Sequence, residues 1–163
     1  MCCKYCSRAW SPPPRDLQLI HLGGLLHDIG KLGIPDYILS KDGALTEIEF
    51  CLMKQHPVIG EALLEGVYQY LPLANDNEKE KVFEIVLYHH ERPDGKGYPR
   101  GLSVAQIPTW AMIMSVADAF DAMTTNRSYR QAMSQKQAMN ILVREVGAQF
   151  WGPAVSAFVS LMC

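Results

Sequence analysis

The sequence lacks any apolar run close to the roughly 20 residues that a membrane-spanning helix needs, and its first residues lack the apolar core of a signal peptide. It also lacks an excess of positive charge, because 15 Lys and Arg residues stand against 17 Asp and Glu, for a formal net charge of −2. Such a chain has no general attraction for DNA or for an anionic membrane surface. We therefore expect a cytoplasmic protein that recognises any phosphate group through a few placed residues.

The five cysteines are an odd number and lack the spacing of a disulfide framework, which favours a reducing compartment. Cys3 and Cys6 form a C-x-x-C pair, but no second Cys or His pair stands near them to complete a four-ligand zinc site. The alternative is a frayed N-terminus. Because three consecutive prolines end at Pro14, residues 1–14 are predicted to be a disordered lead or a fragment boundary. Residues 15–163 have the length and composition of one globular domain.

Alternating strand patterns between hairpin turns are missing as well, whereas helical patterns recur along the chain. Apolar residues at helical spacing predict a first helix over residues 16–31. Capping-box pairs predict helices that begin after Thr46 and Ser134, and Ser103 with Gln106 would open a further short one. More helices are expected over residues 57–67, 78–91, 109–123 and 153–162. The prediction is an all-α bundle.

Four of the five histidines stand beside a carboxylate, another histidine or a helix boundary. Three short motifs collect them, and a later helix adds Asp118; the motifs are His27-Asp28-x-x-Lys31, His56-Pro57 and His89-His90-Glu91. Imidazole and carboxylate are ligands suited to Fe, Mn, Co, Ni or Zn, and the absence of cysteine from the set argues against a structural zinc or iron–sulfur site. The motifs favour a catalytic metal centre.

A binuclear centre suits these pairs better than a single ion. Neighbouring residues on a helix point about 100° apart, so the two members of such a pair would bind different ions. Asp28 has two oxygens and is the best candidate to bridge both ions, and two ions can generate a nucleophile from water for phosphodiester hydrolysis. Taken singly, a His-Asp pair is more often a hydrogen-bonded surface feature. His21, six residues before His27, is interpreted as structural.

Four strings of the sequence resemble the HD-GYP domain family in residues, order and spacing, over about residues 22–139. They are LLHDIGKLGIPDYILSKDGALTEIEF, KQHPVIGEALL, LYHHERPDGKGYPRGL and SVADAFDAMTTNRSYRQAMS. The elements that define this family stand here as His27-Asp28 and Gly97-Tyr98-Pro99. The resemblance implies a helical bundle of the HD-domain type that hydrolyses cyclic di-GMP to linear pGpG or onward to GMP. It implies two or three metal ions, iron or manganese with nickel, cobalt or zinc as alternatives, and no organic cofactor.

Carried over by position, the resemblance also implies roles for individual residues. The implied metal ligands are His27, Asp28, His56, His89, His90 and Asp118. The implied catalytic residues are Asp28 and Lys31, the latter as the positive group beside the scissile phosphate. The implied substrate contacts are Lys31, Tyr98, Asp121, Arg127 and Arg130. An alternative interpretation of the two arginines is a solvated charged face. The loop Gly97-Tyr98-Pro99 could instead be a plain turn or a loop that docks a partner.

The family commonly has a helix with a further histidine ahead of its His-Asp helix, and no counterpart stands before residue 15. We expect that a shortened start weakens metal retention and uncovers Leu22 and Leu26, which would favour a homodimer. The implied partners are the cyclic dinucleotide, diguanylate cyclase proteins with a GGDEF domain, and an N-terminal sensory domain absent here. Two further functions stay open: an HD hydrolase of another cyclic nucleotide or dinucleotide, and a catalytically weak module that binds cyclic di-GMP or a partner.

Overall fold

The computed structural model describes residues 13–71, 73–126 and 131–162. In these ranges the regular elements are helices, and the all-α prediction is confirmed for them. They are α1 (Pro14–Leu26), the 3-10 helix η1 (Ile29–Gly33), α2 (Asp36–Leu39), α3 (Glu47–Met53), α4 (His56–Val67), the 3-10 helix η2 (Tyr68–Tyr70), α5 (Asp76–Tyr88), α6 (Thr109–Thr124), α7 (Gln135–Arg144) and α8 (Gly152–Met162). Among the described helices, none is both long and apolar enough to cross a membrane. Cys3 and Cys6 lie outside the described residues.

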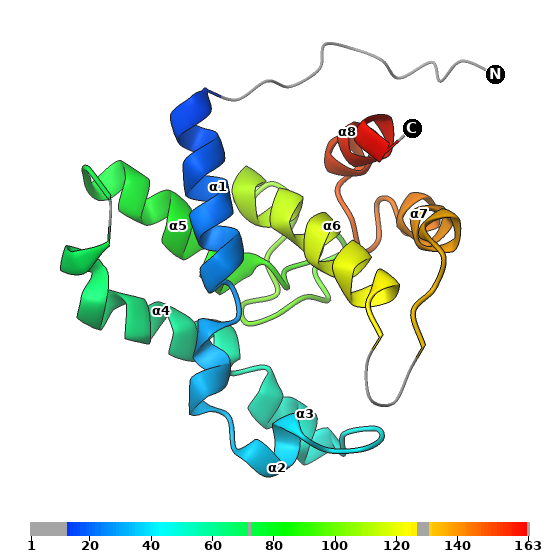
Figure 1. The fold of residues 1–163 in the computed structure, drawn as a ribbon, viewed down its shortest axis with the longest axis horizontal. Helices are drawn as coiled ribbons and strands as arrows, with labels where there is room; N and C mark the ends of the chain where they lie inside the picture. Colours follow the sequence, from blue (N-terminus) through cyan, green and yellow to red (C-terminus); the bar gives the residue numbers. More distant parts are fainter. Residues whose placement is uncertain (1–12, 72, 127–130, 163) are drawn as a thin grey trace.

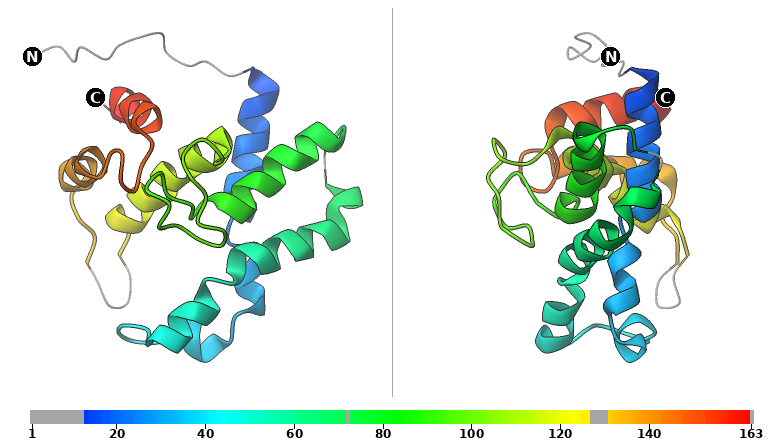
Figure 2. Two further views of the ribbon diagram at one scale, coloured as in Figure 1. Left: turned by 180° about the vertical axis from the view of Figure 1, so that it is seen from behind. Right: turned by 90° about the vertical axis from the view of Figure 1, so that its left-hand side faces the viewer.

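Two larger apolar cores organise the helices, and a third, smaller one contains Ile107, Ala111 and Met112 (Figures 1 and 2). The first lies among α1, α4 and α5 and contains Leu19, Leu64, Val82, Phe83 and Val86. The second lies among α6, α7 and α8 and contains Val116, Leu142, Phe150, Ala154 and Val155. Helix α6 packs on α5 and joins the two cores. Helices α2 and α3 project from the lower end of the molecule in Figure 1, and α3 has no buried residue.

Side-chain caps explain where several helices begin. The two capping boxes predicted at Thr46 and Ser134 are both present. Helix α5 starts two residues before its predicted start, because the side chain of Asn75 accepts a hydrogen bond from the backbone N–H of Glu78 at 3.1 Å. This cap satisfies one of the N–H groups that the first turn of a helix leaves without a partner.

Other boundary predictions were wrong. Helix α1 begins at Pro14 instead of after it, because a proline in the first helical turn loses no hydrogen bond. The side-chain oxygen of Gln106 accepts hydrogen bonds from the N–H and the hydroxyl of Ser103, but these residues form a turn and no helix. The short helix α2 was not predicted. Its four residues are too few to show a helical repeat in the sequence.

The first helix ends at Leu26 and does not continue to residue 31 as predicted. The chain tightens into η1, which runs directly against the backbone of α4. A Cβ atom at Gly30 would lie 1.8 Å from the carbonyl oxygen of His56 and 2.5 Å from the backbone nitrogen of Gly60. Only glycine leaves room for this approach. The contact brings the residues that follow α1 next to the first residue of α4.

The apolar patch predicted at Leu22 and Leu26 was also wrong, since both side chains pack against the first core. They lie three and seven residues after the core residue Leu19, and so on the same face of α1. The large apolar side chains that α1 exposes are instead Leu17 and Leu25, of which 53% and 69% of the surface is accessible.

Gly30→Ala should destabilise the fold by about 3 kcal/mol or more, because the new methyl group would overlap a backbone atom that cannot rotate away. Gly66→Ala is the matched control within α4. A Cβ atom there meets nothing within 4 Å, and alanine should stabilise the helix by about 0.5–1 kcal/mol. Urea unfolding followed by circular dichroism measures both variants. Equal stability of the two would contradict the close approach of η1 to α4.

Candidate metal centre

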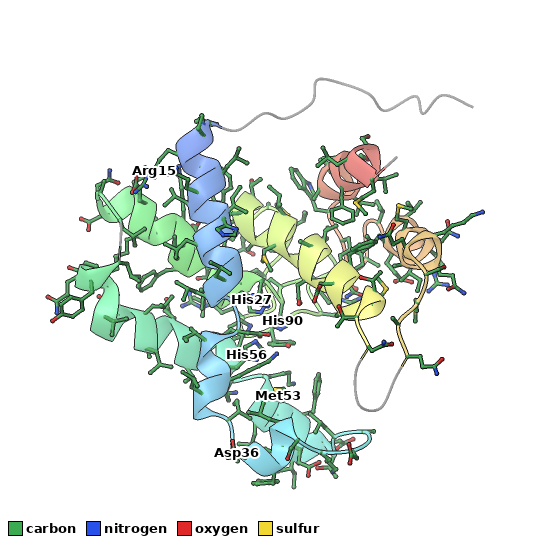
Figure 3. The ribbon with its side chains drawn as sticks, in the orientation of Figure 1. Arg15, His27, Asp36, Met53, His56 and His90 are labelled. Atoms are coloured by element: carbon green, nitrogen blue, oxygen red, sulfur yellow. The ribbon has the colours of Figure 1, made fainter. Side chains whose placement is uncertain are left out.

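The predicted metal ligands come from segments far apart in the sequence that meet where α1, α4, α5 and α6 approach one another (Figure 3). His27 and Asp28 follow α1, and His56 is the first residue of α4. His89 and His90 follow α5. Asp118 lies in the middle of α6. In Figure 3 the labelled rings of His27, His56 and His90 lie together at this junction.

Asp28, His56, His89 and His90 form one tight group, in which one ligand atom of each residue lies within 4.8 Å of the others. The Nε2 atom of His56 lies 3.4 Å from Oδ1 of Asp28 and 3.4 Å from Nε2 of His89. Imidazole nitrogens and a carboxylate without a thiolate are a donor set for a divalent transition metal. The group is therefore suited to hold a divalent metal ion.

Asp28 faces a second group with its other oxygen. Its Oδ2 atom lies 3.3 Å from Nε2 of His27, which in turn lies 3.7 Å from Oδ1 of Asp118. The two carboxylate oxygens of Asp28 thus have different neighbours, because Oδ1 faces His56 and Oδ2 faces His27. A carboxylate that lies between two ions needs this arrangement.

Backbone carbonyl groups at helix ends hold three of the imidazole rings. The Nδ1 atoms of His27, His56 and His89 lie 2.6, 2.8 and 2.9 Å from the carbonyl oxygens of Gly24, Met53 and Val86. Each carbonyl belongs to the last turn of its helix, where the helix itself supplies no partner. When Nδ1 donates its N–H to the carbonyl, the lone pair of Nε2 remains for a cation, as in histidine ligands generally.

Burial keeps most of these rings neutral. Burial, together with the positive charges that His27 and His56 can carry, lowers the pKa of His89 to about 4. Burial likewise lowers the pKa of His56 and of His90. At neutral pH these three rings therefore carry no proton that would have to leave before a cation binds.

The pKa values of Asp28 and His27 shift in opposite directions. Burial alone would raise the pKa of Asp28, but hydrogen bonds from His27 and Lys31 hold it far below its usual range. Burial alone would lower the pKa of His27, but hydrogen bonds to Asp118 and Asp28 raise it to about 10. Without a cation, His27 thus holds a proton between two carboxylates. A divalent cation can take the place of that proton, because a histidine ligand must be neutral.

Two of the residues with predicted catalytic or substrate-binding roles lie at this group. The ammonium nitrogen of Lys31 lies 2.5 Å from Oδ2 of Asp28. The ring of Tyr98 stacks on the ring of His90, with centroids 4.6 Å apart and planes at 29°. Burial raises the pKa of the Tyr98 hydroxyl, which therefore stays protonated at neutral pH.

Other predicted residues are less closely tied to the group. Asp121 is exposed on α6, one turn beyond Asp118. Its Oδ1 atom lies 3.4 Å from the hydroxyl of Thr125. Arg127 and Arg130 lie outside the described residues, so their predicted contacts with phosphate stay predictions.

Glu91 was not predicted as a site residue, yet it organises the loop that carries Tyr98. Its carboxylate is almost fully buried, with 1% of the residue accessible, and accepts three backbone hydrogen bonds. The donors are the N–H groups of Arg100 (2.6 Å), Gly101 (3.1 Å) and Leu102 (2.8 Å). The only signal in the sequence is that this glutamate directly follows the histidine pair. Its burial could not be predicted from that position.

Close backbone contacts complete this loop. A Cβ atom at Gly97 would lie 2.4 Å from the backbone nitrogen of Arg92 and 2.5 Å from Cα of Glu91. The N–H of Tyr98 donates a hydrogen bond to the carbonyl of His90 at 3.2 Å. Together with the carboxylate of Glu91, these contacts hold the tyrosine ring over the imidazole of His90.

Comparison with known proteins agrees with this geometry. A family model described as HD domain matches residues 1–155. The chain is 42% identical over 142 residues to a cyclic di-GMP phosphodiesterase of Thermotoga maritima, covering 87% of this chain and 37% of that protein. It is 41% identical over 127 residues to 3'3'-cGAMP-specific phosphodiesterase 1 of Vibrio cholerae, covering 78% of this chain and 27% of that protein. The chain thus spans less than half the length of either relative.

A solved structure has the same fold. Bd1817, an HDG"Y"P protein from Bdellovibrio bacteriovorus, superposes with a TM-score of 0.66 over 93% of this chain and 45% of that chain. Its sequence is 22% identical, so the likeness concerns the fold alone. Because the family model matches nearly the whole sequence and the helices bring its His-Asp pair to the metal-binding group, the chain belongs to the HD domain family and carries the Gly97-Tyr98-Pro99 motif of the HD-GYP type.

Proposed function

We propose that the protein is a metal-dependent phosphodiesterase that hydrolyses a cyclic dinucleotide, with cyclic di-GMP as the leading substrate. The observation that carries this proposal is Asp28, whose two oxygens face separate groups of imidazole and carboxylate ligands. A pair of metal ions is a common device for cleaving phosphodiesters. The name of the relative from Thermotoga maritima supports the choice of substrate.

We propose iron or manganese as the two resident ions, since imidazole and carboxylate suit both. His27, Asp28 and Asp118 would hold one of them. Asp28 with His56, His89 and His90 would hold the other. When bound, the ions would polarise the phosphate and lower the pKa of water. The chain itself keeps the ligand carboxylates ionised and orients the imidazole rings through the carbonyl groups at the helix ends.

Lys31 would act at the phosphate. Its side chain is 38% exposed and its ammonium group lies beside Asp28, so it can reach a substrate that approaches the same carboxylate. A positive group there can stabilise the charge that develops on phosphorus oxygens or protonate the leaving oxygen. Tyr98, stacked on His90, would shape one side of the substrate site. This position favours a role of the 97–99 loop in the pocket over docking of a diguanylate cyclase.

A second substrate, 3'3'-cGAMP, is favoured by the relative from Vibrio cholerae that is named for it. Anaerobically purified protein incubated with each cyclic dinucleotide, followed by chromatography of the products, tests both. The expected result is conversion of cyclic di-GMP to pGpG or GMP. Failure to cleave either dinucleotide while metal is bound would contradict the proposed activity and would favour a module that only binds its ligand.

Asp28→Ala should abolish turnover and lose most of the bound metal, because its two oxygens would hold both ions. The wild-type protein should carry close to two equivalents of iron or manganese in elemental analysis. Asp42→Ala, which changes an exposed aspartate of a turn, is the control and should keep the metal. One equivalent of zinc alone in the wild type would rule out the binuclear centre.

Lys31→Ala should retain the metal but lose turnover by about 100-fold, the usual scale for removal of an acid or base group. Comparison of metal content and turnover between Lys31→Ala and Asp28→Ala distinguishes a residue that acts on the substrate from one that holds the ions. Lys136→Ala, on the exposed start of α7, is the control. If Lys31→Ala lost the metal as well, its role would be to stabilise the ligand carboxylate.

Glu91→Gln should lower the free energy of unfolding by about 1–3 kcal/mol and raise the KM for the dinucleotide, while the metal content stays the same. The amide has one acceptor oxygen for three backbone N–H donors, so the loop that holds Tyr98 should loosen. Urea unfolding and steady-state kinetics measure the two effects. An unchanged KM would show that the loop is not needed for binding.

A further inference from the structure

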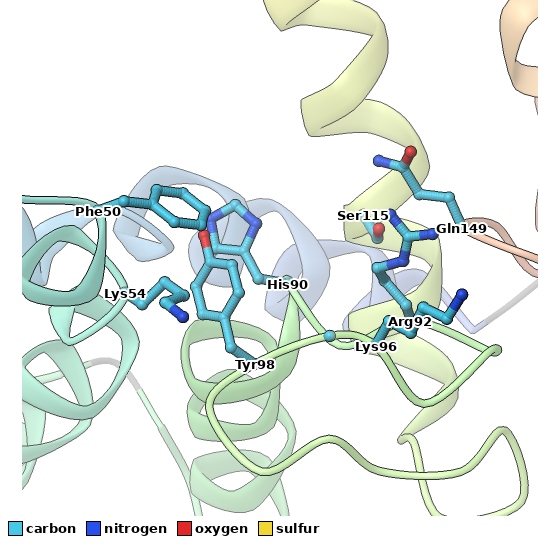
Figure 4. A pocket seen from close by; sticks show the side chains of 9 residues that line it. Phe50, Lys54, His90, Arg92, Lys96, Tyr98, Ser115 and Gln149 are labelled. Carbon is cyan, nitrogen blue, oxygen red and sulfur yellow. The ribbon is translucent and has the colours of Figure 1, made fainter. Parts of the chain in front are cut away.

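Helix α3 carries apolar side chains on more than one side, yet none of its residues is buried. Ile48 and Leu52 lie one turn apart on the same side and are both exposed, Ile48 to 76%. Phe50 and Lys54 lie on the opposite side and line a pocket of about 280 Å³ that shares His90 with the metal-binding group (Figure 4). A helix with apolar residues all round is normally buried. The outer side of α3, with Ile48 and Leu52, lacks such cover in the described chain.

The neighbouring elements add exposed apolar side chains at the same end of the molecule. Leu32 in η1 is 79% exposed, and Tyr37 and Leu39 in α2 are exposed as well. Single exposed apolar residues are normal on a protein surface. With Ile48 and Leu52, however, five large ones stand within residues 32–52, on elements that project together from the lower end of the molecule in Figure 1. Gathered apolar side chains of this kind mark an interaction site. We call residues 32–52 the projecting end.

The projecting end is negatively charged. It has four carboxylates and one lysine, so its formal charge is −3, whereas the whole chain has −2. Its lysine, Lys41, forms an ion pair with Glu49. Asp36, Asp42 and Glu47 are exposed and form no ion pair with another described residue. The exposed apolar side chains thus have neighbouring carboxylates that lack a paired cation in the described chain.

The negative charge decides which kind of partner fits the projecting end. A two-fold contact between two copies of the chain would place this end against itself and bring carboxylates together. An anionic membrane surface would repel the same carboxylates. A helix whose apolar face is flanked by Lys or Arg suits both features, because its apolar side chains cover Ile48 and Leu52 while its cations approach the carboxylates.

We propose that the projecting end docks a basic amphipathic helix of a partner protein. The contact lies close to the metal-binding group, because α3 leads directly toward His56, the first residue of α4. Phe50 on the inner side of α3 lies edge-on to Tyr98, with ring centroids 6.4 Å apart. A partner on the outer side of α3 therefore holds the segment that forms one wall of the pocket. The docking itself does not depend on the proposed enzymatic function.

Two fluorescent synthetic peptides test this chemistry. Both have about 18 residues, or five helical turns, with Leu at the same helical spacing. One has Lys at the remaining positions and the other has Glu. Fluorescence anisotropy with the full chain measures their dissociation constants. The Lys peptide should bind about 10-fold more tightly than the Glu peptide or better, and this difference should shrink at high salt, which screens exposed charges.

Variants of the chain locate the binding surface. The double variant Ile48→Ser with Leu52→Ser should weaken binding of the Lys peptide by about 10-fold or more, because it removes apolar contact area. The double variant Asp36→Asn with Glu47→Gln should weaken it by about threefold or more and flatten its dependence on salt. Val143→Ser, which changes an exposed apolar residue of α7, is the matched control and should bind like the wild type. Circular dichroism checks that all variants are folded.

Several outcomes would overturn the proposal. They are equal binding of the two peptides, no binding of the Lys peptide, and wild-type affinity in both double variants. A dimer of the wild type in sedimentation that the double variant Ile48→Ser with Leu52→Ser abolishes would assign the surface to a second copy instead. Binding to phosphatidylserine vesicles that depends on the same two residues would assign it to a membrane. None of these measurements involves cleavage of a dinucleotide, so failure of the docking leaves the proposed function intact.

Discussion

At Gly30 the backbone of η1 lies so close to the first turns of α4 that no side chain fits between them. This contact has consequences on both sides. It holds the residues that follow α1 beside His56, the first residue of α4, and so sets the distance of 3.4 Å between Oδ1 of Asp28 and the imidazole of His56. Because His27 precedes Asp28 directly, the second oxygen of the same carboxylate faces the other group of ligands. One glycine contact thus orients the carboxylate on which both groups converge.

Carbonyl groups at the ends of helices orient three of the histidine rings in the site. A helix leaves its last carbonyl groups without internal partners, and burying such groups is costly unless another donor reaches them. Here the Nδ1 atoms of three histidines reach carbonyls at the ends of α1, α3 and α5. The same hydrogen bonds satisfy the helix ends and select the tautomer in which Nε2 can bind a cation. Fold stability and ligand orientation therefore depend on the same contacts.

Negative and positive side chains lie in different parts of the site. The carboxylates of Asp28 and Asp118 lie at the metal-binding group, whereas Lys54 and Lys96 line a pocket of about 280 Å³ that shares His90 with this group. The carboxylate of Glu91 holds the loop that carries Tyr98, because it accepts hydrogen bonds from three backbone N–H groups.

The sequence by itself determined the helical class, the capped starts of α3 and α7, and the histidines and carboxylates that meet in the site. These features depend on residues within a few positions of one another, and local hydrogen bonds and helical spacing act over that range. The tertiary structure alone decided the early end of α1, the packing of Leu22 and Leu26 against the first core, the role of Glu91 and the pocket beside Phe50. Each of these depends on a partner from a distant segment. The packing of η1 on α4, of α1 on α5, and of the 92–102 loop on its own buried carboxylate brings those partners together, and no local pattern of residues encodes such contacts.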